Sequence, residues 1–186
     1  MAMPVLVPRY TAREIRDFPD DRVRYEVIRG ELFVTPAPGL WHQRAVLSIA
    51  RLLQEYLERT GLGEVLIAPF EVELTVDSAV QPDVLVILAD RARLLTPKRL
   101  MGAPSLAVEV ISYTSKRTDR LQKRRLYQEE GVPEYWIVDV DQRQVERWTP
   151  RDEIPELLKG RMEWRPGADV PALEIDLGAL FERVCR

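Results

Sequence analysis

The sequence contains no asparagine, one cysteine, one histidine and only four lysines among its 27 basic residues. The one cysteine, Cys185, excludes an internal disulfide and a zinc site built from several cysteines, and it indicates a reducing compartment. No stretch approaches the ~20 consecutive apolar residues that a membrane helix needs. The first residues also lack the basic start and apolar run of a signal peptide. We therefore expect a cytoplasmic protein without a membrane segment.

Charge and size narrow the class of protein further. The formal net charge is −3, so any nucleic-acid binding must come from a local basic patch. The missing asparagine and the 14 prolines suit a thermophile, although a GC-rich genome would give the same arginine bias. A chain of 186 residues is long enough for one domain with a substantial core. We expect residues 1–186 to form that single domain.

Helical spacing and strand-like runs alternate along the chain. The predicted helices are Thr11–Asp17, Trp41–Thr60, Ser115–Glu130 and Leu177–Val184. The predicted strands are Tyr25–Ile28, Leu32–Thr35, Glu64–Ala68, Phe70–Val76, Val84–Leu88, Leu106–Ile111, Glu134–Val140 and Val145–Thr149, with one more near Glu163. Val84–Leu88 and Leu106–Ile111 are almost wholly apolar, as central strands covered on both faces are. This order predicts an α/β domain with a mixed sheet between helices.

Two acidic residues lie in or beside these apolar runs. Asp83 directly precedes the first run, and Glu109 lies inside the second. Because side chains alternate along a strand, Glu109 shares a face with Ala107 and Ile111. An ionised carboxylate buried there needs a partner, and a metal ion or a basic side chain is the usual one.

Each acid also has a purely structural explanation. Asp83 follows Pro82 and could be an ordinary turn residue, which is the interpretation we favour when it is taken alone. Glu109 could form a salt bridge to an arginine. For Glu109 we favour a functional role, because carboxylates inside a core are rare unless they are paired or bind a metal.

The predicted helix after Glu109 is strongly basic. Within it, Asp119 and Lys123 are four residues apart and so lie on one face. A solvated charged face explains most of these residues, with an Asp–Lys pair contributing only ~0.3–0.5 kcal/mol. Lys123 is set apart only by the direction of the strand that precedes the helix.

Several short motifs then follow one another in a fixed order. They are Tyr25–Leu32, His42 near a helix start, Pro82-Asp83, Val108–Ser112, the set Asp119, Lys123 and Tyr127, and Gly131–Asp139. Together they resemble the Uma-two-type restriction endonucleases of the PD-(D/E)XK nuclease superfamily. The resemblance covers roughly residues 10 to 175, and a shared order arises by chance less easily than one short motif.

The resemblance implies a restriction endonuclease-like fold, in which a central mixed β-sheet is flanked by α-helices. It also implies a Mg²⁺ (or Mn²⁺) site at one end of the sheet. Asp83 and Glu109 match the two acidic positions of the family, and the backbone carbonyl of Val110 is a candidate third ligand. Glu31, or less favoured Glu26, matches an additional acid near the site.

The superfamily lysine normally stands two residues after the acid, where this sequence has Ile111. The resemblance implies that the lysine comes from the following helix instead, and Lys123 matches that place. Lys123 would then position the attacking water or stabilise the developing charge on the phosphoryl group.

The remaining candidates are weighed against structural roles. His42 is more simply a polar residue at a helix start than a site-lining group, and Tyr127 faces either the site or the core. Asp119 is a further candidate to line the site, while Tyr135 and Trp136 are expected in the core. Candidate residues to hold the DNA backbone in a salt-sensitive way are Arg117, Arg120 and Arg124.

These observations favour a divalent-metal-dependent endonuclease acting on DNA. The alternative is an inactive nucleic-acid-binding or interaction module that keeps the nuclease fold, which Ile111 and the acidic balance motivate. Because DNA is two-fold symmetric, we also expect a homodimer or a higher homo-oligomer.

Overall fold

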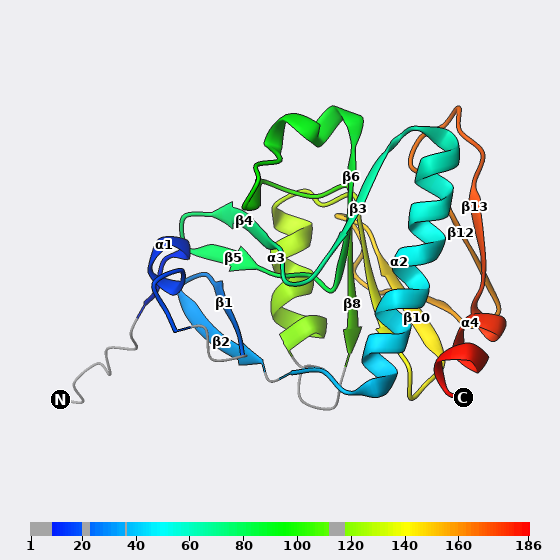
Figure 1. The fold of residues 1–186 in the computed structure, drawn as a ribbon, viewed down its shortest axis with the longest axis horizontal. Coiled ribbons are helices and arrows are strands. Elements are labelled where there is room, and N and C mark those ends of the chain that lie inside the picture. The colour runs from blue at the N-terminus through cyan, green and yellow to red at the C-terminus, as the bar shows by residue number, and fades with distance from the viewer. Residues whose placement is uncertain (1–8, 20–22, 36, 112–117) are drawn as a thin grey trace.

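The computed structural model describes residues 9–19, 23–35, 37–111 and 118–186, with the side chains of residues 118 and 119 left aside (Figure 1). The elements in chain order are α1 (Ala12–Ile15), β1 (Arg24–Ile28), β2 (Glu31–Thr35), α2 (Leu40–Thr60), β3 (Gly63–Ile67), β4 (Glu71–Thr75), β5 (Ser78–Val80), β6 (Val84–Leu88), η1 (Ala89–Leu94), β7 (Arg99–Met101), β8 (Leu106–Ile111), η2 (Thr118–Lys123), α3 (Arg124–Glu129), β9 (Glu134–Asp139), β10 (Gln144–Trp148), β11 (Glu156–Leu158), β12 (Arg161–Trp164), β13 (Leu173–Asp176) and α4 (Leu177–Val184). Here η1 is a 3₁₀-helix and η2 is a π-helix.

The central sheet is mixed, as the sequence predicts. Its six strands run in the order β11-β10-β9-β8-β6-β3, and only β8 and β9 among them pair in parallel. A second sheet has the order β2-β1-β5-β4-β7, and β12 and β13 form a separate hairpin. The parallel β8–β9 pair is possible because the residues between them form the crossover that carries η2 and α3.

Helices cover both faces of the central sheet. In Figure 1, α2 and α3 lie on opposite sides of β6 and β8. One core packs α2, α4 and the β12–β13 hairpin against the sheet, with Leu53, Trp136 and Phe181 at its centre. The other core lies between the central sheet, α3 and the second sheet, and contains Ile87, Tyr127 and Tyr135. Alternate side chains of β6 and β8 thus point into two separate cores, one on each face of the sheet. This explains why both strands are almost wholly apolar.

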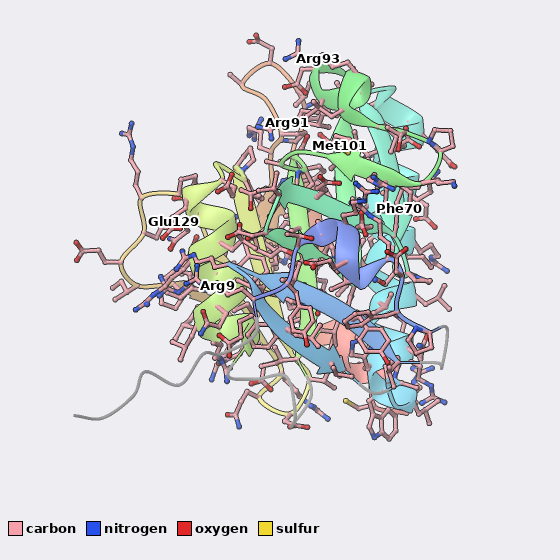
Figure 2. All side chains as sticks on the ribbon, turned by 90° about the vertical axis from the view of Figure 1, so that its left-hand side faces the viewer. Arg9, Phe70, Arg91, Arg93, Met101 and Glu129 are labelled. Atoms are coloured by element: carbon pink, nitrogen blue, oxygen red, sulfur yellow. The ribbon has the colours of Figure 1, made fainter. Side chains whose placement is uncertain are left out.

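Local chemistry accounts for the ends of the predicted elements. Thr11 caps α1 in a capping box with Glu14, and Gly61 ends α2 in the left-handed conformation with φ 68°. Arg29 (φ 53°) and Gly30 (φ 81°) turn the β1–β2 hairpin. Beside this turn, Arg29 forms an ion pair with Glu129 at the end of α3. Figure 2 labels Glu129. The ion pair connects α3 to the second sheet.

The predicted helix Ser115–Glu130 differs from the structure. Its first residues lie outside the described part of the chain, and the segment from Thr118 to Lys123 is π-helical before α3 begins. The sequence prediction also missed β5, β7 and β11, which are three residues long, and the four-residue β13. Strands of this length show too little alternation to be recognised.

Gly63 offers a test of the packing between β3 and β6. A Cβ added there would lie 2.2 Å from the carbonyl oxygen of Ile87, a backbone atom of the neighbouring strand. We expect Gly63→Ala to lower the free energy of unfolding by about 1–3 kcal/mol, because the ladder must shift to make room. Urea unfolding measures the difference. Gly160→Ala is the matched control, since nothing lies within 4 Å of its added Cβ, and equal effects of the two would contradict the packing.

Candidate active site

Asp83 and Glu109 approach each other across adjacent strands. In the antiparallel β6–β8 register Val84 lies opposite Val108, so continuing it by one residue sets Asp83 opposite Glu109. Both residues are only 2% exposed. Glu109 shares its face of β8 with apolar residues that belong to the core beneath α3. The predicted burial of Glu109 is therefore confirmed.

Asp83 is held from three sides. Its Oδ1 accepts hydrogen bonds of 3.0 Å from both terminal nitrogens of Arg24, and its Oδ2 lies 2.9 Å from His42 Nε2. The amide N–H of Val110 also donates to Oδ2, at 2.9 Å. Burial raises the pKa of Asp83, but the bond to His42 and the charges of His42, Arg24 and Lys123 outweigh burial and leave the pKa below its ordinary value. Asp83 is thus an ionised, oriented carboxylate.

Glu109 contacts Lys123, which arrives from the helix that follows its own strand. Lys123 Nζ donates to Glu109 Oε1 at 2.8 Å and lies 2.9 Å from Glu26 Oε1. The Tyr127 hydroxyl also donates to Glu109 Oε1, at 3.3 Å, so Tyr127 faces the site as well as the core. The backbone N–H of Gln81 donates to Glu26 Oε1 at 2.7 Å. One lysine therefore joins an acid of the second sheet to an acid of the central sheet.

Glu26, and not Glu31, is the additional acid that contacts this cluster, which reverses the preference drawn from the sequence. Glu31 pairs with Ile28 in the β1–β2 ladder and so points to the same face as Glu26, but it lies nearer the turn and is exposed. Glu26 is 1% exposed. A polar residue at a hairpin turn and one inside a strand look alike in sequence when both are flanked by apolar residues.

Arg24 and His42 are further members of the site that sequence reasoning missed or ranked low. Arg24 stands two residues before Glu26 in β1, so alternation alone places both on one face. That spacing was a usable signal. His42 lies in the first turn of α2, and its ring reaches Asp83 instead of solvent, against the simpler interpretation.

Two of the candidate DNA-binding arginines have partners within the chain. Arg120 pairs with Asp139 and Glu146 at 2.8 and 2.6 Å. Arg124 donates to Gln128 and lies over the Trp148 ring, 4.7 Å from its centroid. Their charges are already engaged by these contacts, so a role on a DNA backbone does not follow from their positions.

Four other positions complete the comparison. Arg117 and the side chain of Asp119 lie outside the described part of the chain. Val110 lies between the two acids, and the contact the structure shows is through its N–H, whereas its carbonyl as a ligand stays a prediction. Ile111 is buried in the core beneath α3.

The donor set of the cluster fits a Mg²⁺-type ion held by few protein ligands. Three buried carboxylates, those of Asp83, Glu109 and Glu26, face Arg24, His42 and Lys123. In the part of the chain that the structure describes, no three His, Cys, Asp or Glu side chains are arranged to hold a metal ion. Mg²⁺ is commonly bound through one or two carboxylates, with waters and substrate phosphates completing its shell. Asp83 and Glu109 are two buried carboxylates on adjacent strands, so the residue types present fit such an ion.

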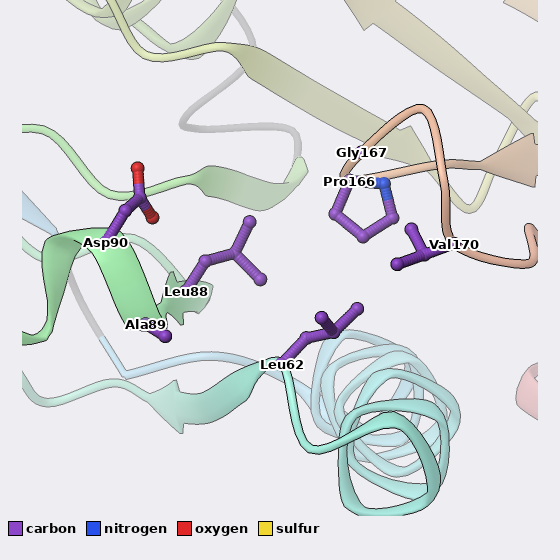
Figure 3. Close-up of a pocket in the computed structure, with 7 residues that line it drawn as sticks. All are labelled: Leu62, Leu88, Ala89, Asp90, Pro166, Gly167 and Val170. Atoms are coloured by element: carbon purple, nitrogen blue, oxygen red, sulfur yellow. The ribbon is translucent and has the colours of Figure 1, made fainter.

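Two cavities lined by described residues lie away from these acids. One, of about 220 Å³, is lined by Leu62, Leu88 and Val170 at the far end of β6 from Asp83 (Figure 3). A neighbouring cavity of about 230 Å³ is lined by Asp90 and Glu134, among other residues. Neither contains a member of the acid–lysine cluster, so the chemistry of the cluster defines the candidate site and the cavities do not.

The mixed sheet between helices, with paired acids at one end, defines a restriction endonuclease-like fold. The chain belongs to the Uma2 family, described as "Putative restriction endonuclease", which matches residues 12–178. A crystal structure of a "putative nuclease belonging to DUF820" from Anabaena variabilis is similar, with a TM-score of 0.76 and 18% identity over 94% of this chain and 99% of that one. At this identity the likeness shows the fold.

No curated protein matches the chain. Among the helices of the described residues, none is long and apolar enough to cross a membrane.

The lowered pKa of Asp83 makes its contribution to stability depend on pH. A carboxyl whose folded pKa lies below its unfolded value stabilises the fold above about pH 4, and that contribution is lost as the pH falls through the folded pKa. We expect Asp83→Asn to lower the free energy of unfolding at neutral pH by about 3–5 kcal/mol, because it breaks a buried ion pair. The gap between variant and wild type should shrink below about pH 4. Urea unfolding across this range measures it, and a constant gap would contradict the pairing.

Proposed function

We propose that this protein is a divalent-metal-dependent endonuclease that hydrolyses phosphodiester bonds in DNA. The observation that supports it most is the convergence of Asp83, Glu109 and Lys123, all buried, at one end of the β6–β8 pair. A family of restriction-endonuclease type supplies the substrate class.

Asp83 and Glu109 would hold the ion, Mg²⁺ or Mn²⁺, which when bound supplies charge neutralisation and a more acidic water. Arg24 and the amide of Val110 fix the direction of the Asp83 carboxylate. Together with His42 they make four contacts to its two oxygens, so at least one contact must give way when an ion enters. His42 holds the same carboxylate from the first turn of α2.

Lys123 is the group best placed to act on the reacting phosphate. In the hydrolysis, water attacks phosphorus, the bond from phosphorus to one bridging oxygen breaks, and that oxygen takes up a proton. A protonated Lys123 beside Glu109 would orient the water and stabilise the negative charge that grows on the phosphoryl oxygens. Its two carboxylate partners keep the ammonium charged inside an otherwise apolar layer.

An inactive module that keeps the fold remains the competing proposal, since Arg24, His42 and Lys123 already pair the acids. For the active form we propose a homodimer, because a two-fold pair of sites matches the two strands of DNA.

Removal of a site carboxylate separates these proposals. We expect Mn²⁺ to bind wild type in a calorimetric titration and to support plasmid cleavage. Glu109→Gln should remove both, and Lys123→Met should keep Mn²⁺ binding but lower kcat by roughly 10²–10³. Circular dichroism checks that each variant is folded. Cleavage by Glu109→Gln at the wild-type rate would reject the assignment.

The pair Glu26→Gln and Glu31→Gln is matched, because both acids lie on one face of the β1–β2 hairpin. We expect Glu26→Gln to lower kcat, since it removes a partner of Lys123, and Glu31→Gln to cleave as wild type does. The reverse result would restore Glu31 as the additional acid and contradict the geometry.

A further inference from the structure

A second ionic cluster lies on the same face of the central sheet as Glu109. Across the parallel β8–β9 register Glu109 is beside Ile137, and across the β9–β10 register Ile137 is opposite Glu146. Asp139 lies beside Ile111 in the next row. Residues side by side in a sheet point to one face, so these acids all lie beneath the segment that carries η2 and α3.

Arg120 of η2 bridges the two outer acids. Its Nε and a terminal nitrogen bond Glu146, at 2.8 and 2.6 Å, and the same terminal nitrogen bonds Asp139 at 2.8 Å. Asp139 is 1% and Glu146 6% exposed. Neither carboxylate can be left unpaired in such a place without a large cost, so the guanidinium fixes where η2 rests on β9 and β10.

Arg120 and Lys123 are three residues apart in the same π-helical segment. Each cation bridges two buried carboxylates, Arg120 over β9 and β10, and Lys123 between β8 and β1. π-helical turns are rare, and they frequently occur at functional sites. Because the two contacts fall within one turn, a shift of η2 at Arg120 must also displace Lys123 from Glu109.

We propose that Arg120, clamped between Asp139 and Glu146, is a positioning residue that sets the place of Lys123 in the active site. The expected effect of Arg120 on cleavage rests on the proposed nuclease function. The expected effect of Arg120 on the position of Lys123 does not. A lysine on the strand itself would have its place set by the pleat. A lysine on a following helix depends on how that helix docks, and Arg120, three residues before Lys123, supplies a charged docking contact.

The structural consequence can be measured without any cleavage assay. The chain has four lysines, of which Lys98 and Lys159 are exposed and Lys123 is 2% exposed. A buried, ion-paired ammonium exchanges its hydrogens slowly enough to give a ¹H–¹⁵N signal, which Lys123→Met identifies by its loss. We expect Arg120→Gln to shift or broaden this signal. Arg125→Gln, which removes an exposed charge from the same helix, should leave it unchanged.

The catalytic consequence is a separate measurement on the full chain with Mn²⁺ and plasmid DNA. Arg120→Gln should lower kcat by about tenfold to a hundredfold with KM within about twofold, since a displacement near 1 Å suffices for such a loss. Arg125→Gln should leave kcat unchanged, and any effect that it has should be on KM. If Arg120→Gln does not fold, Arg120→Lys keeps the charge but bonds fewer acceptors, and it should show an intermediate shift and an intermediate kcat.

An unchanged Lys123 signal in a folded Arg120→Gln or Arg120→Lys variant would overturn the proposal, whatever happens to cleavage. A signal that moves in the Arg120 variants but not in Arg125→Gln supports it. Should wild type cleave no DNA, the nuclease function fails, and the ammonium signal still decides whether Arg120 positions Lys123.

Discussion

The architecture of the site depends on one ammonium group. Lys123 bonds Glu109 of the central sheet and Glu26 of the second sheet, and it is itself carried by a π-helical segment that packs between them. None of the three charges is exposed enough for water to replace a missing partner. The sheets and the helix must therefore be in place together. The apolar core around Leu126 and Tyr135 brings them into contact, and the lysine fixes their register.

Such a network is a poor way to gain stability. Taking charges out of water to bury them costs about as much free energy as their attraction returns. Apolar residues of equal volume would often make the protein as stable or more stable. The site nevertheless contains three carboxylates with Arg24, His42 and Lys123, in a layer otherwise filled by aliphatic and aromatic side chains. A divalent cation held by Asp83 and Glu109, as proposed above, would add positive charge to this cluster. The physical cost of the cluster is best explained if its charges act on something that enters from outside.

Much of this arrangement could be predicted from the sequence, and particular residues show where prediction stops. The apolar runs of β6 and β8 and the alternation around Glu109 located a buried acid that needed a cationic partner. The identity of that partner came from the resemblance, because no spacing rule joins Lys123 to a strand fourteen residues earlier. The sequence resemblance ranked Glu31 above Glu26, and the contacts reverse that order, because both lie on the same hairpin face and only tertiary packing buries Glu26. Arg24 was within reach of the alternation rule, whereas the π-helical form of Thr118–Lys123 was not, because propensity does not distinguish it from an α-helix.

Ile111 gives the departure from the superfamily pattern a physical meaning. At 5% exposure it packs in the core beneath α3, beside Asp139 of the next strand. A lysine in its place would put a charge among aliphatic side chains, with Asp139 already engaged by Arg120. Placing the lysine on the helix frees this position for packing. If Lys123 acts in catalysis as proposed, the place of its charge depends on the docking of η2 and not on a strand. The carboxylates paired with Arg120 and Lys123 would hold η2 in that place.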